Sequence, residues 1–192
     1  QMLRLIILFF LLPLPTQALE FAMPVGLKKI AQHDNALDTV LLPLNIWDGS
    51  KVPSKKFIGA SSKVVFRSDV ATKPDAIAAV ILPQLIANGY KLTLQCADQY
   101  CGGFDFRFSL KVLPPPEMYV DLGNYIFIGF QKGNDKAAWV LISQSLKQTH
   151  VQLTTIQPTQ NKDLKFSTLP VPKGPEQLSS QLTETGHFIL AD

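Results

Sequence analysis

Two short segments of the sequence, residues 125–130 and 137–142, are almost wholly apolar. The turn-forming residues Gly133, Asn134 and Asp135 lie between them. Two apolar runs on either side of such a turn predict a β-hairpin. Because the side chains are apolar in both directions along each run, we expect strands that are buried on both faces or lie centrally in a sheet. This hairpin constrains the fold more than any other feature of the chain.

Further short strands are predicted where apolar and polar residues alternate. The clearest alternation is Phe104–Leu110, in which the three phenylalanines and Leu110 would share one strand face. Such an aromatic ladder can stack nucleic-acid bases, but few basic residues flank it, and we expect it to pack in the core. The other expected strands cover residues 40–44 (an edge strand, because it contains Pro43), 57–58 and 63–67 connected by residues 59–62, 90–96, and 151–153.

One helix is predicted, over about residues 73–88. Pro74 and Asp75 are typical of a helix start, and Asn88-Gly89 is typical of an end. Apolar residues recur inside at helical spacing, whereas Pro83 should kink or interrupt the helix. The fold class expected is therefore α+β, an antiparallel sheet of about six or seven strands with this one main helix packed on one face.

The first eighteen residues have the pattern of a secretory signal peptide. Arg4 precedes eight consecutive apolar residues, 5–12, and the run stops at Pro13. A retained membrane anchor would need about 20 apolar residues, so cleavage is the favoured interpretation. We place it after Ala18, and we expect the mature protein to be exported.

Cys96 and Cys101 are the only cysteines, with four residues between them. In an oxidising compartment an even number of cysteines at close spacing indicates a disulfide. Residues 90, 92, 94 and 96 are expected on one strand face, which would point Cys96 into the core. Two alternatives stay open, a redox-active cysteine pair and a zinc site. A redox pair normally has two intervening residues rather than four. A zinc site needs about four ligands, and the three histidines (His33, His150, His187) do not have the spacing of zinc ligands. We expect neither a metal nor a cofactor.

Composition and charge divide the chain into five parts. Residues 1–18 are the signal peptide, 19–36 an irregular lead-in, 37–157 the α+β domain, 158–186 a Pro-rich linker with a short helix, and 187–192 the start of a C-terminal domain.

The formal net charge of the chain is only +3, and the charged residues are scattered along it, which argues against a nucleic-acid partner.

No sequence motif of an enzyme is present: there is no G-x-S-x-G, no H-E-x-x-H and no Gly-rich phosphate loop. Acidic pairs drawn from Asp98, Asp105, Glu117 and Asp121 could be proposed as acid and base, but 15 acidic residues make such pairs expected by chance. We predict a non-enzymatic module with no catalytic residues. The alternatives are an exported hydrolase and a soluble periplasmic ligand-binding domain with a pocket between the helix and the sheet.

The run from Cys96 through Cys101-Gly-Gly-Phe-Asp-Phe-Arg-Phe108 carries a family resemblance, with looser support from Leu42-Pro43-Leu44, Asp48-Gly49 and Met118–Leu122. It resembles the N-terminal region of OmpA-family outer-membrane proteins of Gram-negative bacteria. The resemblance implies a periplasmic domain associated with the outer membrane. Its partners would be cell-envelope components, the outer membrane or peptidoglycan, reached through a C-terminal peptidoglycan-binding module. The aspartate and arginine of that module have no counterpart here, so no residue takes over its role, and no catalytic activity is implied.

Overall fold

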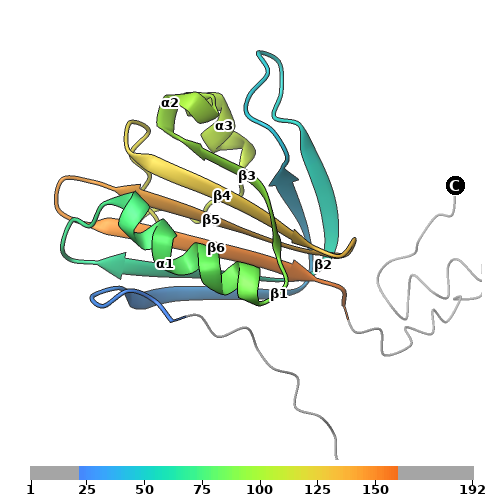
Figure 1. Cartoon of the computed structure of the whole chain (residues 1–192), viewed down its shortest axis with the longest axis horizontal. Helices are drawn as coiled ribbons and strands as arrows, with labels where there is room; N and C mark the ends of the chain where they lie inside the picture. Colours follow the sequence, from blue (N-terminus) through green and yellow to red (C-terminus); the bar gives the residue numbers. More distant parts are fainter. Residues whose placement is uncertain (1–21, 160–192) are drawn as a thin grey trace, which may run out of the picture. The chain divides into compact units, whose positions relative to one another are not determined.

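The computed structural model describes residues 22–159, which form an α+β unit around one six-stranded antiparallel sheet. The strand order is β1-β2-β6-β5-β4-β3 (Figure 1). The strands are β1 (Lys28–Pro43), β2 (Ser54–Ser68), β3 (Lys91–Ala97), β4 (Tyr125–Lys132), β5 (Lys136–Gln144) and β6 (Thr149–Gln157). The helices are α1 (Pro74–Ala87), α2 (Asp98–Cys101) and α3 (Gly103–Ser109). The antiparallel sheet and its number of strands agree with the prediction from the sequence. The described residues contain three helices, however, and not the one that was predicted.

The predicted hairpin is confirmed as β4 and β5, which pair antiparallel from Tyr125↔Ser143 to Lys132↔Lys136. Gly133 turns the chain between them with a φ of 62°. Residues 125–130 and 137–143 are all buried. The burial on both faces has a simple cause, because α1 covers one face of the sheet and α3 with the following segment covers the other.

The face under α1 is closed by aliphatic side chains. Ile77, Ile81 and Leu85 of α1 are fully buried and belong to one core cluster with Ile128 and Val140 of the hairpin. The helix stays helical through Pro83, which lies on its exposed side, so the predicted interruption is absent. The space in which a ligand pocket was considered, between this helix and the sheet, is therefore packed core.

The opposite face carries a second core built around aromatic rings. Phe106 of α3 meets Phe127 of β4 edge-on at a centroid distance of 5.1 Å, and Phe127 lies 6.2 Å from Trp139 of β5. All three side chains are at most 1% exposed. Residues 110–124, which we call the strap, continue from α3 across this face without forming a helix or a strand.

The prediction of a strand at 104–110 is wrong, because these residues form α3. The alternating pattern also contains pairs four residues apart, and in a helix these pairs share a face. Phe106 and Leu110 are the buried pair, whereas Phe104 and Phe108 are 60% and 64% exposed. The preceding Gly102 adopts a φ of 116°, which lets the chain turn directly from α2 into α3.

Three further expectations need correction. The lead-in assigned to 19–36 contains the first nine residues of β1, because pairing with β2 orders a stretch that lacks apolar periodicity. The two strands at 57–58 and 63–67 are one continuous strand, β2, which includes the presumed connection. In β3 a register shift between Leu92 and Leu94 moves the side chains to the other face, so Tyr90 packs under α1 but Cys96 packs on the opposite core.

Residues 1–21 and 160–192 lie outside the described part. The predicted signal peptide with its cleavage site at Ala18, the predicted C-terminal segment 187–192 and nearly all of the predicted linker 158–186 fall there. Within residues 22–159, no helix is both long enough and apolar enough to cross a membrane.

Candidate functional site

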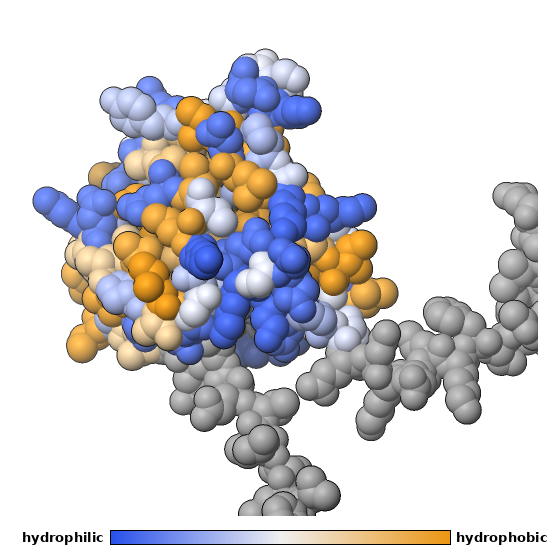
Figure 2. Space-filling model, turned by 45° about the vertical axis from the view of Figure 1, so that its right-hand side comes forward, coloured by the Kyte–Doolittle hydropathy of each residue, from blue (hydrophilic) through white to orange (hydrophobic). Residues whose placement is uncertain are grey.

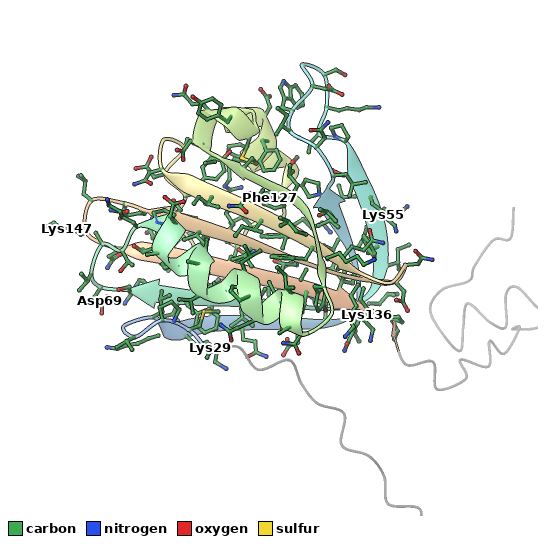
Figure 3. The ribbon with its side chains drawn as sticks, in the orientation of Figure 1. Lys29, Lys55, Asp69, Phe127, Lys136 and Lys147 are labelled. Carbon is green, nitrogen blue, oxygen red and sulfur yellow. A yellow bond between two sulfur atoms is a disulfide. The ribbon has the colours of Figure 1, made fainter. Side chains whose placement is uncertain are left out.

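Three exposed aromatic side chains lie on α2 and α3, the two short helices that follow the edge strand β3 (Figures 1 and 3). Tyr100, Phe104 and Phe108 expose 85%, 60% and 64% of their surface, and we call this group the aromatic tip. The rings of Phe104 and Phe108 lie 4.2 Å apart, tilted by 33°. The Arg107 guanidinium lies 5.3 Å from the Phe108 centroid, within cation–π range.

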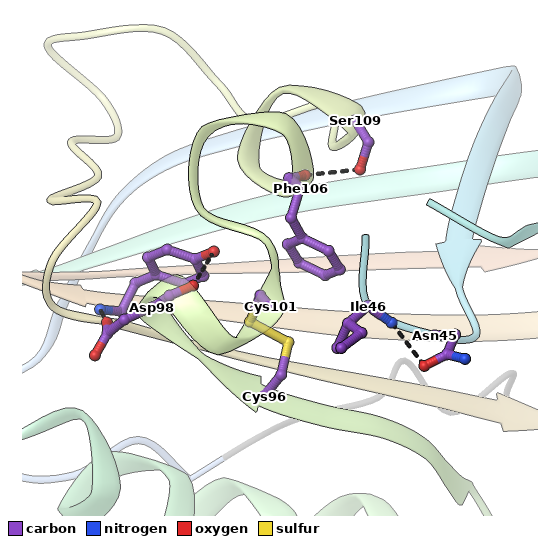
Figure 4. Close-up of a disulfide and its surroundings, with 8 residues drawn as sticks. Asn45, Ile46, Cys96, Asp98, Cys101, Phe106 and Ser109 are labelled. Atoms are coloured by element: carbon purple, nitrogen blue, oxygen red, sulfur yellow. Dashed lines mark hydrogen bonds between the residues drawn. A yellow bond between two sulfur atoms is a disulfide. The ribbon is translucent and has the colours of Figure 1, made fainter. Parts of the chain in front are cut away.

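The disulfide is the first of three contacts that fix the tip to the sheet. Cys96 at the end of β3 is bonded to Cys101 of α2, with their Cα atoms 5.2 Å apart (Figure 4). Cys101 is fully buried and Cys96 packs partly against the same core. The bond therefore joins α2 to β3 directly, and the disulfide predicted from the sequence is present in the structure.

Asp98 makes the second contact. It adopts a φ of 47°, which is uncommon for a residue other than glycine, and its carboxylate accepts the backbone N–H of Tyr125. The Tyr125 hydroxyl donates back to the Asp98 carbonyl at 3.0 Å. Burial, together with the nearby Asp98 carboxylate, raises the pKa of Tyr125 to about 12, so the phenol stays protonated and keeps donating.

Trp47, in the loop between β1 and β2, makes the third contact. Its backbone N–H donates to the Cys101 carbonyl at 2.9 Å. A Cβ placed on Gly102 would lie only 2.2 Å from the Trp47 Cβ, so the loop and the α2–α3 junction touch at a position where only glycine fits. Close by, Ile46 lies beside the disulfide and Phe106 (Figure 4). The loop and the two helices thus form one supported end of the molecule.

A depression of about 380 Å³ adjoins the tip and is lined by Asp98, Gln99, Tyr100 and Gly123. It is open to solvent, and the Asp98 carboxylate that borders it is already engaged with Tyr125. Its chemistry is therefore that of a shallow surface hollow beside Tyr100.

The four acidic residues named as candidate acids and bases differ in their local partners. Asp98 holds Tyr125, and Glu117 pairs with His33, with Oε2 2.9 Å from Nε2. Asp121 accepts the backbone N–H of Gly123, and Asp105 lies exposed on α3. Asp98, Glu117 and Asp121 thus each accept a hydrogen bond from a different local partner.

A polar cluster around Asp38 lies on the sheet face under the strap. Asp38 accepts hydrogen bonds from Ser61 Oγ at 2.8 Å and Lys63 Nζ at 3.1 Å, and Lys111 Nζ lies at 3.3 Å. Burial acts to raise the pKa of Asp38, but the hydrogen bonds from Ser61, Lys63 and the Thr39 N–H outweigh it and hold the pKa well below its usual value. The cluster joins β1, β2 and the strap, which is a structural role.

The histidines do not form a metal site in the described part. His33 pairs with Glu117, and His150 is 2% exposed against Tyr119, with the ring centroids 5.4 Å apart. His187 lies outside the described residues. Across residues 22–159, no group of three or more potential ligands comes together for a metal ion.

The sequence reasoning missed the tip. It assigned Phe104 and Phe108 to the core and gave Trp47 no role. The four-residue spacing of Phe104 and Phe108, directly after Gly102-Gly103, is the signal that could have indicated a short helix with one exposed aromatic face.

Comparison of the sequence with models of known protein families and with curated proteins gives no match.

Proposed function

We propose that the chain is a non-enzymatic module of the bacterial cell envelope, and that it binds another envelope component through the aromatic tip. In this proposal it is the N-terminal periplasmic domain of an OmpA-like, outer-membrane-associated protein. A C-terminal domain following residue 186 would contact the outer membrane or peptidoglycan. The signal-peptide pattern of residues 1–18 and the Cys96–Cys101 bond support export to an oxidising compartment.

The observation that carries the proposal is the rigid presentation of exposed aromatic rings. Exposed apolar clusters in soluble domains mark interaction sites more often than isolated surface residues do. Here the disulfide, Asp98 and Trp47 all fix the backbone that bears the rings. Tyrosine, tryptophan, phenylalanine and arginine are also enriched at protein interfaces relative to the rest of the surface.

The arrangement of polar groups favours binding over hydrolysis. The carboxylates of Asp98, Glu117 and Asp121 accept hydrogen bonds or ion pairs that hold the fold together. A general acid or base would need to be free to reach a substrate. In this structure each of the three is engaged with a neighbouring group of the same chain.

Fractionation of the native cell envelope tests the proposal. The protein should be recovered with the outer-membrane or peptidoglycan fraction, and its non-reduced mass should be two daltons below that of the dithiol form. Recovery of the whole population in the soluble periplasmic extract would contradict it.

A further inference from the structure

We infer that the aromatic tip docks on an anionic phospholipid surface, with Phe104 and Phe108 entering the boundary between headgroups and acyl chains. This inference rests on the proposed function, since it names the envelope component that the tip contacts.

The position of the tip suits a flat surface. The helices α2 and α3 and the neighbouring β1–β2 loop lie together at one end of the molecule (Figure 1). Figure 2 shows hydrophobic surface between the more polar protrusions of this end. Side chains on such a projecting end can reach a membrane without obstruction by the sheet, whereas a small-molecule site is normally concave.

The side chains have the chemistry of a membrane interface. Phe104 and Phe108 supply apolar rings, and Tyr100 carries a hydroxyl on a ring that is 85% exposed. Tyrosine is favoured where one end of the side chain is apolar and the other is wet. The Arg107 guanidinium lies over the Phe108 ring. It can turn from that ring to a lipid phosphate while the methylene groups of its side chain stay at the level of the apolar rings.

The charges around the tip favour anionic lipid. In residues 44–56 and 98–109, the basic residues are Lys51, Lys55, Lys56 and Arg107, and the acidic ones are Asp48, Asp98 and Asp105, which leaves a positive excess of one charge. The carboxylate of Asp48 is occupied by the backbone N–H groups of Ser50 and Lys51. A positive excess beside exposed apolar rings is the combination that binds acidic membrane surfaces.

The chain contains its own reporter for this contact. It has two tryptophans, of which Trp47 lies in the β1–β2 loop against the α2–α3 junction and Trp139 is 1% exposed in the core. The full chain is mixed with vesicles of phosphatidylethanolamine and phosphatidylglycerol, a fraction of which carry brominated acyl chains. Bromine quenches tryptophan only at short range, so quenching should come from Trp47 and disappear in the Trp47→Phe variant.

Matched variants separate the tip from any other contact. Phe104→Ser with Phe108→Ser should lower the apparent vesicle affinity about tenfold or more, because both rings lose their apolar burial. Leu146→Ser, at a side chain that is 99% exposed in the turn before β6, should leave it unchanged. Any anchoring by the apolar segment 5–12 is the same in all variants. An emission spectrum without vesicles that matches that of the unaltered chain verifies that each variant folds.

The outcomes decide the inference in both directions. Quenching of Trp47 that needs both phenylalanines and is weaker on pure phosphatidylcholine vesicles supports it. Quenching that is absent in the unaltered chain, or survives the double substitution, or is equal on phosphatidylcholine, overturns it. Absence of quenching together with recovery in the envelope fraction would leave the proposed function standing and direct the search to a protein or peptidoglycan partner.

Discussion

The two faces of the sheet are closed by different means. Under α1 the core cluster consists of apolar side chains with Tyr90, and Ile77, Ile81 and Leu85 contribute the helix side of it. On the opposite face, buried Gln152 bonds to the backbone of the strap, with its Oε1 2.8 Å from the Leu113 nitrogen and its Nε2 3.2 Å from the Lys111 oxygen. The disulfide and the Asp98 contact add to these bonds.

This difference indicates which face of the sheet has a backbone held in one geometry. Apolar burial is non-directional and tolerates small shifts of the helix. Hydrogen bonds to buried groups and a disulfide require one geometry, and loss of a partner leaves a buried polar atom unsatisfied. The face that carries the aromatic tip is therefore the one whose backbone is fixed by directional contacts, as a presented binding surface requires.

The largest effect is expected from Ile81→Ala in α1. Removal of this fully buried side chain should lower the free energy of unfolding by about 2–5 kcal/mol, through lost burial and the cavity left behind. Ile86→Ala, at a position 52% exposed in the same helix, should lower the free energy of unfolding by well under half of that amount. Urea unfolding of both variants measures the contrast, and equal losses would show that α1 is not held by its buried stripe.

The face under α1 is also the part that the sequence predicts well. Helical spacing located α1 to within a residue at each end, and the continuous apolar runs with Gly133-Asn134-Asp135 located the central hairpin. Both signals are periodic and local, and both elements bury side chains in the regular way that such patterns report. Strand order depends on long-range pairing, such as β2 with β6, for which the sequence offers no periodic signal.

The second prediction concerns the junction that supports the tip. Gly102→Ala should lower the free energy of unfolding by about 2–3 kcal/mol, because its new Cβ would meet Trp47 and a φ of 116° is strained for alanine. Gly103→Ala also has a positive φ, 56°, but no atom lies within 4 Å of its Cβ position. It should cost about 1 kcal/mol. Equal costs in denaturant unfolding would mean that the Trp47 contact does not matter.

The tip itself could not be read from alternation. Residues 104–110 fit a strand pattern perfectly, but Cys96–Cys101 and Gly102 turn the chain into a helix before that pattern can pair with the sheet. The strap escaped prediction for a related reason. Its backbone is hydrogen-bonded by the side chains of Gln152 and Ser143, which belong to other parts of the sequence. Such contacts produce no periodic pattern in the sequence of the strap itself.

The third prediction tests the disulfide. Replacing Cys96 and Cys101 together by serine should lower the free energy of unfolding by about 2 kcal/mol, since the closed ring is short. Hydrogen exchange should rise more in residues 96–110 than in α1, because the two regions are secured by different contacts. Reductant should reproduce the loss in the unaltered chain and have no effect on the double variant. Uniform exchange across both faces would remove the distinction drawn between them.

The smallest effect is expected from His150, on the strap side of β6. The side chain is 2% exposed, neither ring nitrogen has a hydrogen-bond partner among the described residues, and Tyr119 of the strap lies against it. Burial, with a contribution from the charge of Arg67, lowers the pKa of His150 below its usual value of 6.5. The folded chain therefore takes up a proton less readily than the unfolded chain does.

Stability should consequently be level above the usual histidine pKa and fall as the pH drops below 6.5, with a slope of at most about 1.4 kcal/mol per pH unit from this group. Asp38 acts in a separate window, because its pKa is lowered from 3.8 and its contribution is lost only below that value. Urea unfolding between pH 8 and 5 measures the slope, which His150→Asn should flatten. A slope that survives in His150→Asn would show that the strap face is not the part of the molecule that responds to mild acid.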